Sequence, residues 1–297
     1  MEKRESEIIK KDQIKNLFPA REKEAKKYDF GYLIIIGGSQ LYSGSPALAA
    51  MAALRTGVDL TLIVAPERSA DIIASFSPNL IAYPLKGHDL GKDHLPILFS
   101  LIESAKKVAH GKVAVLIGGG LGRDDETQEA IREFLSQIEV PCVIDADAIW
   151  AIAPKKEEIL PGKKFILTPH KFEFYVLSGK DVSAFSLEEK IKTVSQFAQS
   201  FKTTILLKGN PDIITNGEKT ALNQTGCPEM TVGGTGDVLA GICGALLSQG
   251  FDEYEVAKVG AFISGKAGEL AREEFSVGLL ATDVIEKIPK VLKSFKI

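Results

Sequence analysis

Short runs of consecutive apolar residues alternate along the chain with longer segments in which apolar residues recur at helical spacing. The runs are Tyr32–Ile36, Leu60–Val64, Val113–Ile117, Pro141–Ile144, Phe165–Leu167 and Thr204–Leu207. Runs without alternation between apolar and polar positions are typical of parallel strands that helices cover on both faces. The pattern therefore predicts an α/β fold, a three-layer α/β/α sandwich with a mostly parallel central sheet.

Helical spacing between these runs predicts the crossover helices of such a sheet. They are expected at Pro46–Arg55, Asp125–Gln137, Leu187–Phe201 and Asp237–Gln249. The longest apolar run, Val238–Leu247, is too short to cross a membrane and predicts a buried helix. Beyond Lys208 the pattern changes to an antiparallel hairpin, with strands at 212–215 and 220–223 around a turn at Asn216-Gly217. The sheet is expected to be mixed at that edge.

The chain shows no Ser/Gly linker, low-complexity block or internal repeat, so we expect one domain over residues 30–297. Residues 1–29 are expected to form a lead-in, with the Lys-rich stretch Glu22–Lys27 in solvent. The first residues, Met1–Lys15, alternate acidic and basic side chains and lack the apolar core of a signal peptide. Secretion is therefore not expected.

The charge balance limits the partners. Lys and Arg number 36 against 39 Asp and Glu, a net charge of -3, so we expect neither nucleic acid nor a membrane as a partner. The cysteines, Cys142, Cys227 and Cys243, form no CxxC pair and suit neither a disulfide framework nor a zinc site. A reducing, cytoplasmic location fits best.

Ligands of open parallel sheets bind beyond the carboxyl ends of the strands, so the segments after the strands are the first candidates for a site. Gly37–Ser45 leaves one strand and opens a helix, where it either presents N–H groups to an anion or merely permits a tight turn. Gly118–Asp124 contains four glycines in five residues, more than a simple connection needs. This second loop favours a ligand that approaches the backbone.

Two further strand ends offer side chains. Asp145 and Asp147 could hold Mg²⁺ through water, bond a ligand hydroxyl, or cap a helix. His170 follows the next strand and is interpreted as a substrate contact rather than a base, although a lone histidine is often structural. Trp150 is expected in the core.

The strongest signal is Met230–Asp237, which runs into a predicted helix. Its glycines, Gly233, Gly234 and Gly236, let backbone N–H groups converge on one point at the positive end of that helix. Asp237 at the helix start, its ionised form stabilised by the helix dipole, could accept a proton from an attacking hydroxyl while the N–H groups stabilise a transferred phosphoryl. Without chemistry it would be an N-cap, but three neighbouring glycines exceed what a cap needs. Lys208–Asp212 adds a cation and open backbone for a nucleotide, and no GxxxxGK[ST] motif is present.

In order and spacing these segments resemble the ribokinase-like superfamily, whose GxGD motif is matched by Gly234–Asp237. Within it, the set GGSxxxSG, GGGLG, DADA, LTPH, LKG and NxTGxxxMxxGGTGD is similar to the NAD(P)H-hydrate dehydratase family. The likeness extends from about Phe30 to Ile285. That family restores NAD(P)H by phosphorylating the hydroxyl of the S epimer of its hydrate with ADP or ATP, after which phosphate leaves.

The resemblance implies a role for particular residues. Ser45, Gly120 and His170 would contact NADH-hydrate or NADPH-hydrate, and Asp237 would bind the ring hydroxyl and act as the base. The nucleotide would be held by Lys208, Gly209, Asn210, Pro211, Asp212, Gly233, Gly234, Thr235 and Gly236. Mg²⁺ is expected from phosphoryl transfer, with no ligands assigned. The resemblance also implies a homo-oligomer, with a tetramer as one form, and a separate epimerase that interconverts the hydrate epimers.

Two other functions stay open from the residues. One is a kinase of the same superfamily, similar to hydroxyethylthiazole kinase, with Asp237 in the same role and a phosphorylated product. Fold alone does not separate that kinase from the dehydratase. The other is a regulatory protein that senses ADP or NAD(P) without turnover, against which the presence of Asp237 argues.

Overall fold

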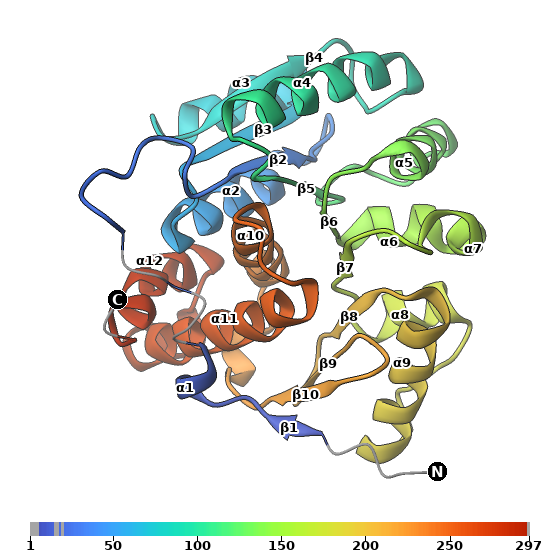
Figure 1. Ribbon diagram of the computed structural model, residues 1–297, viewed down its shortest axis with the longest axis vertical. Coiled ribbons are helices and arrows are strands. Elements are labelled where there is room, and N and C mark those ends of the chain that lie inside the picture. Colours follow the sequence, from blue (N-terminus) through green and yellow to red (C-terminus); the bar gives the residue numbers. More distant parts are fainter. Residues whose placement is uncertain (1–5, 15–17, 19–20, 296–297) are drawn as a thin grey trace.

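A single sheet runs through the computed structural model, which describes residues 6–14, 18 and 21–295 of the chain. Its strand order is β1-β10-β9-β8-β7-β6-β5-β2-β3-β4 (Figure 1). The strands are β1 Glu7–Ile8, β2 Tyr32–Ile36, β3 Leu60–Pro66, β4 Ile81–Leu85, β5 Val113–Ile117, β6 Cys142–Ile144, β7 Phe165–Leu167, β8 Thr204–Leu207, β9 Asp212–Thr215 and β10 Thr220–Asn223.

From β4 to β8 every neighbouring pair of strands is parallel. The hairpin of β9 and β10 then adds antiparallel pairing, and β1 lies parallel to β10 at the far edge. The predicted mostly parallel sheet with one mixed edge is confirmed. Because β5 to β8 and β2 all run the same way, their carboxyl ends lie along one side of the molecule.

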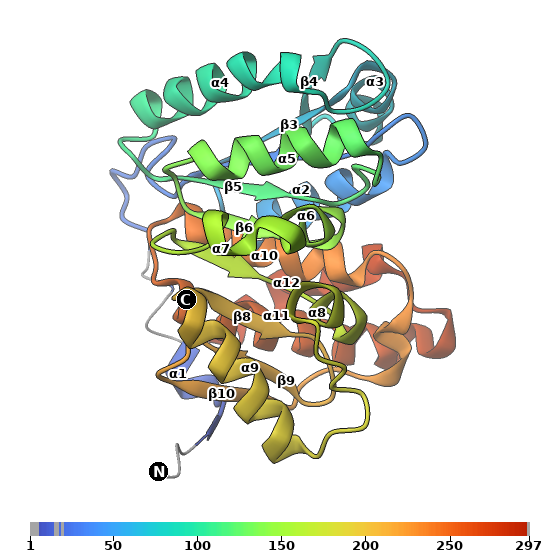
Figure 2. The ribbon, with the colours of Figure 1, turned by 90° about the vertical axis from the view of Figure 1, so that its right-hand side faces the viewer.

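Helices cover both faces of the sheet. They are α1 Lys11–Ile14, α2 Gly44–Thr56, α3 Glu67–Phe76, α4 Leu95–Val108, α5 Asp125–Gln137, α6 Ala146–Ile152, α7 Lys156–Ile159, α8 Lys171–Ser178, α9 Leu187–Phe201, α10 Thr235–Ser248, α11 Glu253–Phe275 and α12 Ala281–Lys293. Figure 1 shows α2, α10, α11 and α12 on one face, and Figure 2 shows α4, α5, α6, α8 and α9 in front of the other. None of the described helices is long and apolar enough to cross a membrane.

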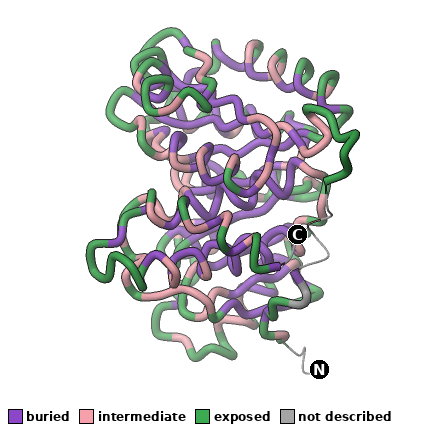
Figure 3. The backbone as a smooth tube through the Cα atoms, turned by 90° about the vertical axis from the view of Figure 1, so that its left-hand side faces the viewer, coloured by how far each residue is buried: buried purple, intermediate pink, exposed green. Residues whose placement is uncertain are grey.

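Strand β2 shows why the apolar runs lack alternation. Leu33 and Ile35 point into the core beneath α2, α10 and α11, whereas Ile34 and Ile36 point into the core beneath α4 and α5. Each of these four side chains is at most 2% exposed, and burying one contributes about 1.5–3 kcal/mol. Figure 3 shows that the buried segments of the chain lie in the interior and the exposed segments at the periphery. The three-layer sandwich is therefore confirmed.

The N-terminal segment takes part in the fold. β1 extends the sheet, and the side chains of Ile9 and Ile14 are buried in the core that includes α11 and α12. Glu22–Lys27 is exposed, as predicted. Residues 1–5, 15–17, 19 and 20, to which part of the prediction for 1–29 applies, lie outside the described residues, as do 296 and 297.

Candidate active site

Three segments from distant parts of the sequence meet beyond the carboxyl ends of β2 and β5. A Cβ on Gly119 would lie 2.1 Å from Ser45 Oγ and 3.0 Å from Asp237 Oδ1, and one on Gly37 would lie 2.7 Å from the Gly119 carbonyl oxygen. Only glycine permits this approach. The sequence therefore uses its glycines to bring the loop after β2, the loop after β5 and helix α10 to one point.

Helix α10 begins two residues earlier than predicted. Its N-cap is Gly234, with a left-handed φ of 95°, so Asp237 is the third residue of the first turn and not the cap. Among the described residues, the backbone N–H groups of Thr235, Gly236 and Asp237 have no hydrogen-bond acceptor, as expected for a first turn. The Thr235 hydroxyl donates to the Met230 carbonyl at 2.7 Å and braces the loop before the helix. The helix start thus offers free donors to an anion.

The Asp237 carboxylate is half-buried beside these donors. Burial raises its pKa to about 6, the hydrogen bond from Ser45 Oγ opposes that rise, and the negative charge of Asp145 adds to it. Loss of hydration is the largest cause, so the net shift is upward, and stabilisation of the ionised form by the helix dipole stays a prediction. A carboxylate with a pKa near 6 is well matched to accept a proton at neutral pH.

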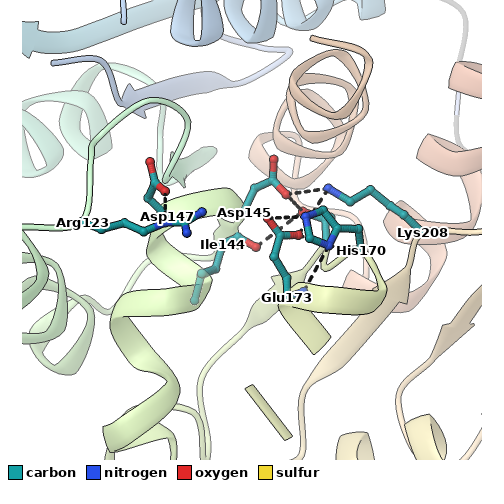
Figure 4. A network of polar contacts seen from close by, with 8 residues as sticks. Arg123, Ile144, Asp145, Asp147, His170, Glu173 and Lys208 are labelled. Atoms are coloured by element: carbon teal, nitrogen blue, oxygen red, sulfur yellow. Dashed lines mark hydrogen bonds and ion pairs between the residues drawn. The ribbon is translucent and has the colours of Figure 1, made fainter. Parts of the chain in front are cut away.

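Lys208, at the end of β8, faces Asp237 across the start of α10. Its Nζ lies 3.1 Å from Asp145 Oδ1 and 3.8 Å from Glu173 Oε2 (Figure 4). A Cβ on Gly236 would lie 3.4 Å from the same nitrogen. Burial by itself would lower the pKa of Lys208, but the charges of Asp145 and Glu173 outweigh it and the pKa is raised. The ammonium therefore stays charged at the point where the glycine loop ends.

Glu173 belongs to this cluster, although its place in the sequence did not indicate a role at the site. It forms a capping box at the start of α8, where its Oε2 accepts from the His170 backbone N–H at 2.8 Å and His170 Nδ1 accepts from the Glu173 N–H at 3.1 Å. Burial raises the pKa of Glu173, and Lys208 opposes that rise. The H-x-x-E spacing before an apolar run was the available signal.

His170 itself is 53% exposed, at the rim of the cluster. Because Nδ1 accepts the capping bond, the neutral ring carries its proton on Nε2. It can therefore donate a hydrogen bond to a ligand while it caps the helix, so the structural and the substrate-contact interpretations are compatible.

The two aspartates after β6 point to different partners. Asp145 Oδ1 accepts from Thr168 Oγ1 at 2.7 Å and from Lys208, and its side chain makes no capping bond to α6. Asp147 instead accepts from the Gly122 N–H at 3.0 Å and from Arg123 Nε at 2.8 Å. Asp145 therefore serves the lysine cluster, and Asp147 fixes the loop after β5.

The segment expected to hold the nucleotide forms a tight turn after β8. The Gly209 N–H donates to Asp212 Oδ1 at 2.8 Å, and Asn223 Nδ2 donates to Asp212 Oδ2 at 2.9 Å. Burial raises the pKa of Asp212 to about 6. Gly209 and Asn210 are exposed and Pro211 follows a cis peptide bond. The backbone of this turn is open to a ligand beside Lys208.

The other selected glycines have distinct surroundings. Gly120, with a φ of 70°, packs against Tyr42, so that a Cβ there would lie 2.8 Å from the tyrosine Cβ. Gly233 is exposed, with nothing within 4 Å of its Cβ position. The structure thus brings Ser45, Asp237 and Lys208 close together and leaves Gly120 and Gly233 around them.

A small cavity lies beneath Asp237, lined by Ser45, Gly119, Asp145 and Ala240 among others. It offers about 10 Å³, roughly the space that one water molecule requires. Within the described part of the chain, no group of three His, Cys, Asp or Glu side chains could hold a metal ion. The site therefore combines the N–H groups at the start of α10 and the Lys208 ammonium, which can bind an anion, with the carboxylate of Asp237, and it is not a closed metal cage.

Comparison with known proteins decides the family. The family model described as NAD(P)H-hydrate dehydratase matches residues 33–290. The chain belongs to the NAD(P)H-hydrate dehydratase family. It is 42% identical over 277 residues to a bifunctional NAD(P)H-hydrate repair enzyme Nnr of Pyrobaculum aerophilum, covering 93% of this chain and 53% of that protein.

Two further likenesses extend over whole chains. An ADP-dependent (S)-NAD(P)H-hydrate dehydratase of Cenarchaeum symbiosum is 34% identical over 292 residues, with 97% of each chain covered. The ADP/ATP-dependent NAD(P)H-hydrate dehydratase from Bacillus subtilis, co-crystallised with ATP and Mg²⁺, has a TM-score of 0.80 at 25% identity and covers 98% of this chain and 99% of that one. This likeness confirms the predicted ribokinase-like α/β fold. The chain spans about half the length of the bifunctional relatives it matches.

Proposed function

We propose that this protein is a nucleotide-dependent (S)-NAD(P)H-hydrate dehydratase, a hydro-lyase that repairs hydrated NADH and NADPH. It would use ADP, or less readily ATP, to phosphorylate the ring hydroxyl and would then release phosphate. One observation carries the proposal, which is the position of the Asp237 carboxylate beside the Lys208 ammonium and the free N–H groups at the start of α10. The names of relatives that cover this chain almost end to end support the substrate and the donor.

In this mechanism Asp237 takes the proton of the ring hydroxyl as its oxygen attacks the terminal phosphorus of the nucleotide. The new O–P bond forms as the bond to the departing nucleotide breaks. Lys208 and the N–H groups of Gly236 and Asp237 stabilise the negative charge on the transferred phosphoryl. Phosphate then leaves with the electron pair of its C–O bond, and loss of a proton from the neighbouring ring carbon restores the double bond.

The substrate and the donor would contact different segments around Asp237. Ser45, Gly120 and His170 would contact the hydrated dinucleotide, and the turn 208–212 with the loop 233–236 would hold the nucleotide. Ser45 orients the Asp237 carboxylate by donating to Oδ1, and Asp145 and Glu173 orient the ammonium of Lys208. Roles for these residues are proposals that rest on this geometry.

Mg²⁺ fits this site in the manner typical of phosphoryl-transfer enzymes. Magnesium is held by one or two carboxylates together with substrate phosphates and water, and Asp145 is a buried carboxylate whose Oδ2 accepts no hydrogen bond from the described residues. Asp145 would therefore be the protein ligand, with nucleotide oxygens supplying the rest. When bound, the ion would neutralise phosphate charge. A homo-oligomer and an epimerase that supplies the S epimer stay predictions.

The test is a coupled absorbance assay with purified protein and Mg²⁺. NADH-hydrate is added with ADP in one cuvette and ATP in another, and recovery of the reduced-nicotinamide absorbance is followed. Recovery of the S epimer with either nucleotide, and not without one, is expected. No recovery with either would reject the dehydratase and leave the small-molecule kinase as the next candidate.

A further inference from the structure

Arg123 follows the glycines of the loop after β5, and its side chain is fixed by two contacts although it is half exposed. Its side chain is 50% exposed, yet Nε donates to Asp147 Oδ1 at 2.8 Å and the guanidinium lies over the Trp150 ring, 3.9 Å from the ring centroid. Exposed ion pairs contribute little to stability. An arginine immobilised at the surface in this way is better explained by something it binds than by the fold.

These two contacts do not use the amino groups of the Arg123 guanidinium. Among the described residues, neither Nη1 nor Nη2 of Arg123 takes part in a hydrogen bond. A planar fork with two free donor groups matches the oxygens of a phosphate, and a fork that is already immobilised loses little entropy on binding. The two unbonded amino groups of Arg123 therefore suit the oxygens of a phosphate.

The backbone that positions Asp147, the partner of Arg123, contains an unfavourable conformation. Ala146 has a left-handed φ of 47°, which is unfavourable for any residue with a Cβ. This residue separates Asp145, which faces Lys208, from Asp147, which faces Arg123 (Figure 4). The turn thus directs two neighbouring carboxylates to two different cations.

Arg123 lies in the same loop as two glycines that pack at the site, Gly119 and Gly120. It lies four residues beyond Gly119, which packs on Ser45 and Asp237, a span of at most about 14 Å of extended chain. Figure 4 shows Arg123 and Lys208 on opposite sides of Asp145. Gly120, a proposed substrate contact, belongs to the same loop after β5, so a dinucleotide that contacts Gly120 would come within reach of Arg123.

Taking the proposed function as given, we infer that Arg123, stacked on Trp150, binds a phosphate of the hydrated dinucleotide and sets the affinity for that substrate. The phosphate belongs either to the diphosphate bridge, which NADH-hydrate and NADPH-hydrate share, or to the 2′-phosphate of NADPH-hydrate alone. Trp150, expected in the core, instead lies half-buried as the support of this fork.

A second arginine provides a matched control. Arg21 is 51% exposed, pairs with Asp59 at 3.2 Å and lies over the Phe30 ring at 4.0 Å, but at the opposite ends of the strands. Its amino groups are occupied, because Nη1 bonds Asp59 and Nη2 bonds the Gly57 carbonyl. Arg21→Gln therefore removes an ion pair and a cation–π contact of the same kind, but no unbonded guanidinium amino groups.

The experiment measures the KM of each hydrate and of ADP in the wild type, Arg123→Gln, Arg123→Lys and Arg21→Gln. Loss of a charge-assisted bond predicts that Arg123→Gln raises the hydrate KM about 10- to 100-fold, with the ADP KM and kcat within about twofold. Arg123→Lys keeps the charge and loses the fork, so a smaller rise is expected. Arg21→Gln should leave every constant within about twofold.

The two hydrates separate the two phosphates. Equal rises for both substrates assign the diphosphate, and a rise confined to NADPH-hydrate assigns the 2′-phosphate. Unchanged KM values for both hydrates would overturn the inference. If Arg123→Gln also changed the oligomeric state on size-exclusion chromatography while KM stayed the same, the exposed ring of Phe172 beside Trp150 would instead be a subunit contact.

Calorimetric titration with NADPH keeps this test independent of turnover. If the wild type binds NADPH and Arg123→Gln binds it at least about tenfold more weakly, the phosphate site stands even where no hydrate is turned over. In that case only the proposed function fails. Equal binding of NADPH by both proteins would reject the site.

Discussion

Lys208 and Lys258 each lie between two carboxylates, but they differ in which partner of the ion pair is exposed to solvent. Lys258 Nζ lies 2.6 Å from Glu7 and 3.3 Å from Glu255, with the lysine side chain 7% exposed and the carboxylates 41% and 36% exposed. Lys208 is 22% exposed, and its partners Asp145 and Glu173 are 5% and 6% exposed. In the first cluster the lysine is buried and its carboxylates are exposed, whereas in the second the carboxylates are buried and the lysine is more exposed.

The difference teaches how to separate a structural ion cluster from a functional one. Lys258 joins β1 to α11 and its charge is already matched by solvated partners. Asp145 and Glu173 keep their charges out of water, which costs free energy, and so hold the ammonium of Lys208 beside the free N–H groups of α10. We expect substitutions in the Lys208 cluster to change catalysis and those in the Lys258 cluster to change only stability.

The largest effect is expected from Asp237→Asn, which removes the proton acceptor and keeps the side-chain shape. A general base contributes about 10²- to 10⁴-fold, so kcat should fall by about that factor. Thermal unfolding should occur at the same or a higher temperature, because a half-buried carboxylate of raised pKa destabilises the fold when ionised. Calorimetric binding of ADP serves as the control and should be retained.

The paired variants Lys208→Met and Lys258→Met test the comparison itself. Loss of one donor to a developing anion costs about 10²- to 10³-fold in kcat, and we expect this for Lys208→Met together with a higher KM for ADP. Lys258→Met should leave kcat/KM within about twofold and lower the free energy of unfolding by about 1 kcal/mol or less. Equal losses of activity in the two variants would contradict the distinction.

Gly119→Ala tests the close approach that forms the site. The added methyl would lie 2.1 Å from Ser45 Oγ and 3.0 Å from Asp237 Oδ1. Both side chains must therefore shift, and displacement of the Asp237 carboxylate should lower kcat about 10- to 100-fold. Gly278→Ala is the control, since its Cβ position has nothing within 4 Å. Steady-state assays of the two variants should differ by at least tenfold.

The pH dependence of activity and of stability should have opposite signs. With the Asp237 pKa raised to about 6, kcat/KM should fall about tenfold per unit as the pH drops below about 6. Asp237 and Asp212 both hold protons more tightly when folded, so their contribution to the free energy of unfolding is fully present below about pH 4 and is lost as the pH rises through about 6.

Ser45→Ala gives the smallest expected effect. Its hydroxyl lowers the pKa of Asp237 by donating to the carboxylate, so its removal should move the acidic limb of the pH profile about one unit upward. Activity at pH 8 should stay within about tenfold of the wild type. An unshifted limb would show that another group titrates there.

Much of the fold could be predicted because buried parallel strands leave a plain signal. Strands β2 and β5 are covered on both faces, so they appear as unbroken apolar runs. The edge strand β4 was not predicted, since it is half-exposed and contains Pro84. Helix α11 was not predicted either, because Gly260, Gly265 and Gly268 weaken its helical pattern. Packing explains all three glycines, since they allow Cys243, Thr225 and Met230 to approach closely.

The site could be predicted only in part. Glycines around Asp237 and Lys208 revealed these two residues, since their spacing is local in the sequence. Glu173 was not selected because its contribution depends on where α8 lies relative to β8. The upward shift of the Asp237 pKa was not predicted, because burial of a side chain depends on the whole fold, whereas the start of a helix is indicated by the local sequence.

The most direct test of the central claim is the balance of products when NADPH-hydrate, ADP and Mg²⁺ are incubated with the enzyme. If the Lys208 and Asp237 cluster phosphorylates the hydrate and phosphate then leaves, NADPH, AMP and inorganic phosphate form in equal amounts, and Asp237→Asn forms none of them. Accumulation of a phosphorylated hydrate without NADPH would instead identify a kinase. Formation of NADPH without AMP would show that the nucleotide takes no part in the reaction.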